Sequence, residues 1–116
     1  LGGLGDVYKR QAMRSIVKQL NNISYRKLWM VIGMVGDKDV SGVLELLPKD
    51  ANYIFCEPNI PRALSADDLL DKAAQYSLKG QKSQNPLDAL VEARKQAQQN
   101  DLIFVGGSTF VVAEIL

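Results

Sequence analysis

The chain contains no histidine and only one cysteine, Cys56, and these two scarcities limit its chemistry. Histidine is the most common general base and metal ligand in proteins, so any acid–base step must use another residue type. A single thiol provides neither an internal disulfide framework nor a cysteine metal site, which favours a reducing, cytoplasmic setting. If the chain belongs to an enzyme, much of the chemistry is therefore expected to lie outside it.

An excess of charge of one sign and long apolar runs are also missing. Lys and Arg number 14 against 13 Asp and Glu, so the net charge is +1, and the charges are interspersed. This composition predicts neither a nucleic-acid surface nor an acidic tail. No apolar run approaches the roughly 20 residues of a membrane span, and no signal peptide is recognised. The 116 residues, 47% of them apolar, suit one domain with a small core.

Residues 1–11, LGGLGDVYKRQ, differ from everything that follows. They are rich in glycine, lack a usable period and lead abruptly into a good helical pattern. We interpret them as a cloning scar or a sequence-assembly remnant and leave them out of the fold prediction. A disordered native N-terminus is the alternative interpretation. The domain itself is expected to span residues 12–116.

The apolar pattern of residues 12–116 alternates between the helical and the strand type. Spacing predicts helices at about 12–23 and 40–47, and continuous apolar runs predict strands at 28–35, 53–56 and 102–105. A weak strand is expected at about 80–84, and a last helix, apolar all round, from Ser108 or Thr109 onward. This order predicts an α/β domain of the Rossmann-like, three-layer kind, with a mainly parallel sheet and helices on both faces.

Two further helices are predicted from their capping residues. Ser65 has Asp68 three residues later, and Asn85 is followed by proline, which is typical of helix starts. Gly80 stands where the first of these helices would take a C-cap. On the second helix, the side chains expected to face the core are Leu87, Leu90, Val91 and Ala97.

Special polar residues follow the predicted strands, in the segments GMVGDKD, CEPNIPRA and VGGST. The carboxyl ends of parallel strands share one edge of the sheet, and ligands bind along that edge. Asp37, Lys38 and Asp39 are therefore expected on one rim with Arg62 and Ser108. Ordinary structural roles compete with this hypothesis: Asp39 as a helix cap, Lys38 as a solvated side chain, Arg62 as an ion-pair partner of Glu57 or Asp67.

Gly106 and Gly107 close the last predicted strand and resemble an anion-binding turn, in which the free N–H groups of a helix start face the ligand. A Gly-Gly turn without any ligand is equally compatible with the pattern. The sequence lacks both the full G-x-G-x-x-G fingerprint and the P-loop lysine pattern.

Four stretches in a fixed order carry a family resemblance over about residues 12–116. They are VIGMVGDKDVSGVLELLP, EPNIPRAL, NPLDALVEARKQA and DLIFVGGSTFVVAEIL. In combination they resemble the C-terminal domain of the folylpolyglutamate synthase/dihydrofolate synthase family, a branch of the Mur ligase superfamily. A peptidoglycan-precursor ligase of the same superfamily is the related alternative, against which the D-K-D and GGST segments favour the folate branch.

The resemblance implies part of an ATP-dependent amide ligase that adds L-glutamate to dihydropteroate or folate through an acyl phosphate. Addition of the first glutamate and extension of a glutamate chain are both compatible with these motifs. In the family, a larger N-terminal ATPase domain holds the P-loop and most ligands of Mg²⁺, and the C-terminal domain closes the ATP and glutamate cleft. The resemblance thus implies no complete catalytic set and no metal site in this chain, which we expect to be inactive and ligand-free alone.

Carried over to this sequence, Ser108 resembles the hydroxyl that helps hold glutamate. Asp37, Lys38 and Asp39 resemble the D-K-D loop that faces the interdomain cleft, and Arg62 resembles the arginine of the P-R-A segment. The chain departs from the family in front of its first helix, where DVYKRQ replaces a D-G-x-H-N segment that contacts the nucleotide. The hypothesis from another class is a free-standing, non-catalytic α/β binding or interaction module.

Overall fold

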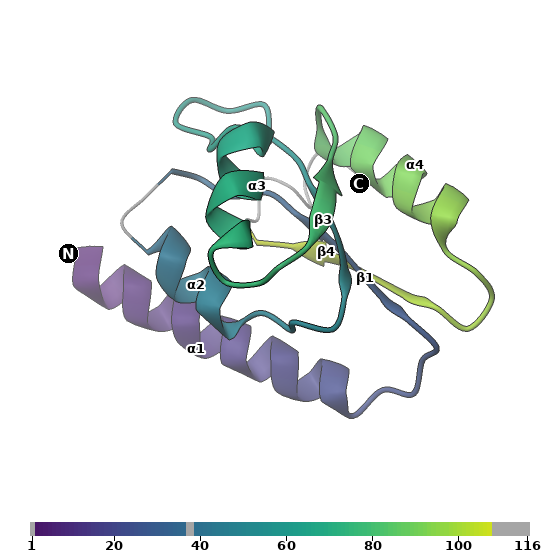
Figure 1. Ribbon diagram of the computed structural model, residues 1–116. Coiled ribbons are helices and arrows are strands. Elements are labelled where there is room, and N and C mark those ends of the chain that lie inside the picture. Colours follow the sequence, from purple (N-terminus) through teal and green to yellow (C-terminus); the bar gives the residue numbers. More distant parts are fainter. Residues whose placement is uncertain (1, 37–38, 108–116) are drawn as a thin grey trace.

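The computed structural model describes residues 2–36 and 39–107, with side chains from residue 8 onward (Figure 1). Its elements are, in chain order, α1 (Gly2–Asn21), β1 (Leu28–Ile32), α2 (Val40–Leu46), β2 (Asn52–Phe55), α3 (Ala66–Ala74), β3 (Gly80–Lys82), α4 (Pro86–Gln96) and β4 (Leu102–Gly106). None of the helices in these ranges is long and apolar enough to cross a membrane. The predicted last helix, from Ser108 or Thr109, lies outside the described residues.

The four described strands form one parallel sheet in the order β3-β2-β1-β4. In the centre of the sheet, Met30 of β1 lies opposite Tyr53 of β2 on one side and Phe104 of β4 on the other. The predicted α/β class, with a mainly parallel sheet, is therefore confirmed. The strand predicted at 28–35 ends earlier, at Ile32, because the chain leaves the sheet at Gly33.

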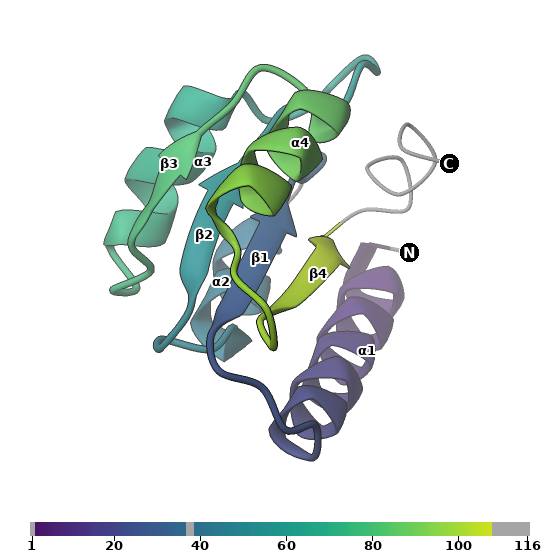
Figure 2. The same cartoon turned by 90° about the vertical axis from the view of Figure 1, so that its right-hand side faces the viewer.

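Alternating side chains of β1 enter two separate cores, which makes the domain three-layered. Met30 and Ile32 join the larger core with side chains of α1, α2 and α3, whereas Trp29 and Val31 join a smaller core under α4. Figure 2 views the molecule from the side of α4, which crosses in front of β1 and β2 while α2 lies behind. Burial on both faces explains the continuous apolar run of this strand.

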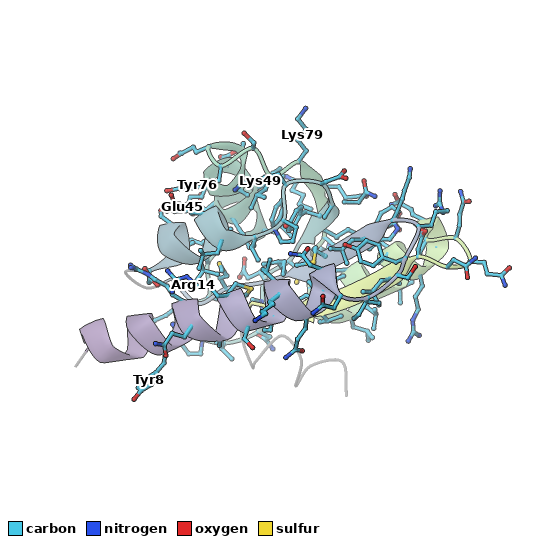
Figure 3. All side chains as sticks on the ribbon, turned by 90° about the horizontal axis from the view of Figure 1, so that it is seen from below. Tyr8, Arg14, Glu45, Lys49, Tyr76 and Lys79 are labelled. Carbon is cyan, nitrogen blue, oxygen red and sulfur yellow. The ribbon has the colours of Figure 1, made fainter. Side chains whose placement is uncertain are left out.

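Helix α1 begins at Gly2, about ten residues before the predicted start at residue 12, and it ends at Asn21. Near the N-terminus of α1, Tyr8 is 62% exposed and points away from the molecule (Figure 3). From residue 8 onward, Met13 is the first side chain of α1 that enters the core. The residues of 1–11 that are described are thus helical, and their origin as a remnant stays a prediction.

The predicted capping of α3 and α4 is confirmed at their starts but not at the end of α3. The Asp68 N–H donates to Ser65 Oγ at 3.1 Å, and the Asp88 N–H donates to Asn85 Oδ1 at 2.8 Å. Gly80 is not a C-cap, because α3 already ends at Ala74 and Gly80 begins β3. The glycine is needed there for packing, since a Cβ at residue 80 would lie 2.3 Å from the carbonyl oxygen of Tyr53.

The predicted inward face of α4 is wrong for two of its four residues. Leu87 is 52% and Val91 45% exposed, while Leu90 and Ala97 are partly buried. Ala89 and Ala93 occupy the fully buried stripe instead, together with Pro86. Small side chains let the helix approach the sheet closely, so the stripe is shifted by a fraction of a turn from the one that the larger residues indicate.

Candidate functional site at the carboxyl ends of the strands

The order of the strands defines a switch point between β1 and β4. From β1 the chain builds outward through β2 to β3, and it then crosses to the other side of β1 to form β4. Helices α2 and α3 lie on one face of the sheet and α4 on the other. In doubly wound sheets ligands bind outside the carboxyl ends of the strands at such a reversal. The segments after β1 and β4 flank this place.

The segments that leave β1 and β4 are in direct backbone contact. The Gly33 N–H donates to the carbonyl oxygen of Gly106 at 3.3 Å. Gly107 has a φ of 93°, and a Cβ there would lie 2.6 Å from the carbonyl oxygen of Gly33. Glycine is therefore required at 107 both by its left-handed backbone and by the neighbouring segment. The N–H groups that would complete an anion-binding turn after Gly107 lie outside the described residues.

Arg62 occupies a tight turn in the segment between β2 and α3. The Ala63 N–H donates to the carbonyl oxygen of Ile60 at 3.3 Å, Pro61 is the second residue of the turn, and Arg62 is the third with a φ of 66°. Proline at the second position and a positive φ at the third are the marks of a type II turn, whose third position usually holds glycine or asparagine.

A short antiparallel bridge ties this turn to the segment that follows β1. The Gly36 N–H donates to the carbonyl oxygen of Arg62 at 2.7 Å, and the Leu64 N–H donates to that of Met34 at 2.9 Å. Between these two bonds, Val35 and Ala63 form an isolated bridge. The structure thus brings Arg62 next to Gly36. Asp37, Lys38 and Ser108 lie outside the described residues, so their place beside Arg62 stays a prediction.

The guanidinium of Arg62 is exposed, and within the described part of the chain it pairs with neither Glu57 nor Asp67. Asp67 instead accepts a hydrogen bond from Lys82 of β3, and this contact raises the pKa of Lys82. Of the two interpretations of Arg62, the structural ion pair is therefore not supported.

Asp39 stands at the N-cap position of α2, but its side chain does not cap the helix. The side chain is only 2% exposed and turns toward α1, where Arg10 Nε donates to both of its carboxylate oxygens at 2.9 Å. Gly42 makes room for the pair, because a Cβ there would lie 2.3 Å from Asp39 Oδ1. The interpretation of Asp39 as a simple helix cap is therefore wrong, and the contact was missed because residues 1–11 were left out of the prediction.

A second buried carboxylate, Asp101, lies at the amino-terminal ends of β1 and β4, opposite the candidate site. Its side chain is fully inaccessible and accepts hydrogen bonds from Arg26 at 2.8 and 3.0 Å and from the Trp29 indole at 3.0 Å. The backbone N–H groups of Lys27 and Gln98 donate to it at 3.2 and 2.9 Å. Asp101 thereby joins the residues that lead into β1 and β4, and nothing in its local sequence singled it out.

The charged form of Asp101 is favoured despite its burial. Burial alone would raise the pKa of this carboxyl, but the hydrogen bonds from Gln98, Arg26 and Trp29 and the charge of Arg26 outweigh it and hold the pKa far below its usual range. Because the carboxylate stays ionised, its hydrogen bonds persist at neutral pH. The starts of the two strands that flank the switch point are therefore held together by a charged group.

The fold and the edge geometry define a three-layered α/β domain whose parallel sheet reverses its order between β1 and β4. The profile of the family described as "Mur ligase, glutamate ligase domain" matches residues 9–109. The chain belongs to this family, as the sequence motifs predicted.

Curated relatives carry names of folate ligases. The chain is 32% identical over 91 residues to a "Dihydrofolate synthase/folylpolyglutamate synthase" of Haemophilus influenzae, covering 76% of this chain and 21% of the relative. It is 31% identical over 107 residues to a "Probable bifunctional folylpolyglutamate synthase/dihydropteroate synthase" of Halobacterium salinarum, covering 89% of this chain and 13% of the relative. The chain thus spans about a fifth or less of the length of these curated relatives.

A solved structure of the same kind shares the fold. The bifunctional folylpolyglutamate synthase/dihydrofolate synthase of Yersinia pestis, complexed with AMPPNP and Mn ion, superposes with a TM-score of 0.79 at 26% identity. The match covers 91% of this chain and 25% of that protein. The predicted architecture of a Mur ligase C-terminal domain is confirmed.

Proposed function

We propose that the chain is the glutamate-side domain of an ATP-dependent ligase that adds L-glutamate to dihydropteroate or a folate. Membership of the glutamate ligase domain family supports this, as do the names of the relatives. The observation that carries most weight is the switch point between β1 and β4, where two motif-bearing segments are in backbone contact. In this proposal the domain closes over a cleft whose other wall is a separate ATPase domain.

The reaction proposed is carboxylate activation followed by amide formation. ATP supplies the phosphoryl group that turns a folate carboxylate into an acyl phosphate, and the amine of glutamate then displaces phosphate. The residues of this chain bind and orient rather than transfer protons. Ser108 holds the glutamate, and Lys38 and Arg62 face anionic groups across the cleft. Such chemistry depends mainly on positioning and on neutralising charge.

The described residues suit the anionic part of ATP better than its metal. Arg62 presents an exposed guanidinium without a partner in the described ranges, and guanidinium groups bind phosphate in a planar, two-pronged geometry. Residues 2–36 and 39–107 contain no group of three or more side chains of the types that hold a metal ion. We therefore propose that this domain contributes phosphate and carboxylate contacts, and that the ATPase domain holds Mg²⁺, as the family resemblance implies.

Steady-state kinetics of the full-length ligase that contains this domain test the proposal. Ser108→Ala is expected to raise the KM for L-glutamate by about tenfold, because a lost hydrogen bond to a charged group costs about 1.5 kcal/mol, and to leave the KM for ATP nearly unchanged. Ser24→Ala, an exposed serine before β1, is the matched control. An unchanged glutamate KM in Ser108→Ala would remove this residue from the site.

Calorimetric titration of the 116-residue chain separates the ligase domain from a free-standing module. A domain that provides only one wall of a cleft should bind L-glutamate and ATP weakly or not at all. Tight binding of another small molecule by the isolated chain would favour the module.

A further inference from the structure

The turn that carries Arg62 places a bulky residue where the backbone prefers glycine. At a φ of 66°, the Cβ of an L-residue crowds the following carbonyl oxygen, so arginine costs free energy at this position. No contact with a described residue offsets that cost, because the side chain is exposed and pairs with no described residue. A strained backbone at a non-glycine residue is an indicator of function when the residue lies at a candidate site.

The strained turn is also held in place by neighbouring backbone. Pro61 restricts the preceding φ, and the two bonds Gly36–Arg62 and Leu64–Met34 attach the turn to the segment that leaves β1. A Cβ at Gly36 would lie 3.2 Å from the carbonyl oxygen of Arg62, so the two segments are in close contact. Arg62 is thus presented from a fixed backbone and not from a free loop.

We propose that Arg62 is a ligand-binding residue for an oxyanion at the carboxyl edge of the sheet, and that this role maintains arginine in a position that favours glycine. The inference rests on the proposed ligase function. The oxyanion is either a phosphate of the nucleotide or a carboxylate of L-glutamate, since both match the planar donor pattern of a guanidinium. Two matched substitutions separate the side chain from the turn: Arg62→Gly removes the guanidinium and the strain, and Arg62→Ala removes the guanidinium alone.

The kinetic test uses the full-length ligase, assayed for ATP consumption that depends on L-glutamate. Both variants should raise the KM of one substrate by about tenfold, and Arg62→Lys should recover part of the loss. A change in the KM for ATP identifies the phosphate, and a change in the KM for glutamate identifies the carboxylate. If the turn alone mattered, Arg62→Gly would keep wild-type kinetics, and that result would overturn the inference.

The stability test uses thermal unfolding of the 116-residue chain. Arg62→Gly should melt about 3 °C higher than Arg62→Ala, because relief of strain outweighs the extra flexibility of glycine in the unfolded chain. Ser77→Gly is the matched control, as Ser77 also has a left-handed φ of 63° but lies in the turn after α3. It should raise the melting temperature and leave both KM values unchanged.

The two tests fail in different ways. Equal melting temperatures for Arg62→Gly and Arg62→Ala would show that arginine is not strained, which removes the basis of the inference. A wild-type ligase that consumes no ATP in response to glutamate would instead refute the proposed function, and the inference with it. Active enzyme with unchanged KM values in both variants would refute the inference alone.

Discussion

The substitution Gly42→Ala should destabilise the chain, although alanine is normally the better residue inside a helix. Gly42 is the third residue of α2, in its first turn, and replacing a helical glycine by alanine usually gains up to about 1 kcal/mol. Here a Cβ would lie 2.3 Å from Asp39 Oδ1 and 2.8 Å from Arg10 Nε. The new methyl group would therefore displace either the carboxylate or the guanidinium.

The size of the effect follows from the burial of Asp39. Its side chain is 2% exposed while that of Arg10 is 45% exposed, so a displaced carboxylate loses charge-assisted hydrogen bonds without gaining water. Such bonds contribute about 1.5–3 kcal/mol, and overpacking adds about 1 kcal/mol or more. After the helical gain of alanine, we expect a net loss of about 2 kcal/mol, or roughly 8 °C in the melting temperature.

Urea denaturation followed by circular dichroism measures this loss directly, and a double-mutant cycle isolates its cause. In the Asp39→Ala background the steric conflict with the carboxylate is absent, so Gly42→Ala should then stabilise the chain by about 1 kcal/mol. The change of sign is the decisive result. If Gly42→Ala stabilised the unmodified chain as well, the packing of Asp39 against Gly42 would be refuted.

Two further predictions concern the two ends of the β1–β4 pair. Asp101→Asn should lower the melting temperature at pH 7, where the wild-type carboxylate is charged in both the folded and the unfolded chain. Because its folded pKa lies below its unfolded value of about 3.9, the stability that it contributes is present above pH 4 and is lost on further acidification. The melting temperatures of the two proteins should therefore draw steadily closer as the pH falls below 4, and a constant difference would contradict the assignment. Gly107→Ala should cost about 2 kcal/mol in urea unfolding, since it combines left-handed strain with a Cβ placed 2.6 Å from Gly33 O; a cost below 0.5 kcal/mol would contradict that geometry.

Features determined by a few neighbouring residues were predictable from the sequence. The side chains of Ser65 and Asn85 cap their helices by accepting a hydrogen bond from the backbone N–H three residues later. Strand β1 is recognisable from its continuous apolar run, because both of its faces are buried. The positions that were predicted wrongly depend on distant contacts. Gly80 serves the backbone of Tyr53, and Val91 is exposed because alanines bring α4 close to the sheet. Local periodicity carries no information about how closely residue 80 approaches Tyr53 or how closely α4 approaches the sheet.

The candidate site shows the same division. The predicted parallel sheet indicated which segments meet at the carboxyl edge, since parallel strands end together. The sequence did not predict that Arg62 has a left-handed backbone, because a positive φ at arginine has no sequence signature. Nor did the sequence predict the role of Asp101, because two of its hydrogen-bond partners, Arg26 and Trp29, lie more than 70 residues earlier in the chain.

The contacts at the two ends of β1 and β4 support the binding edge that we propose at the switch point. At one end the Asp101 carboxylate joins the approaches to both strands, and at the other Gly107 packs against Gly33. With both ends held, the segments leaving the strands start from backbone positions that cannot shift independently. Arg62 is attached to the same frame through Gly36. A guanidinium presented in this way loses little backbone freedom when it binds an anion, so more of the interaction energy is available for affinity.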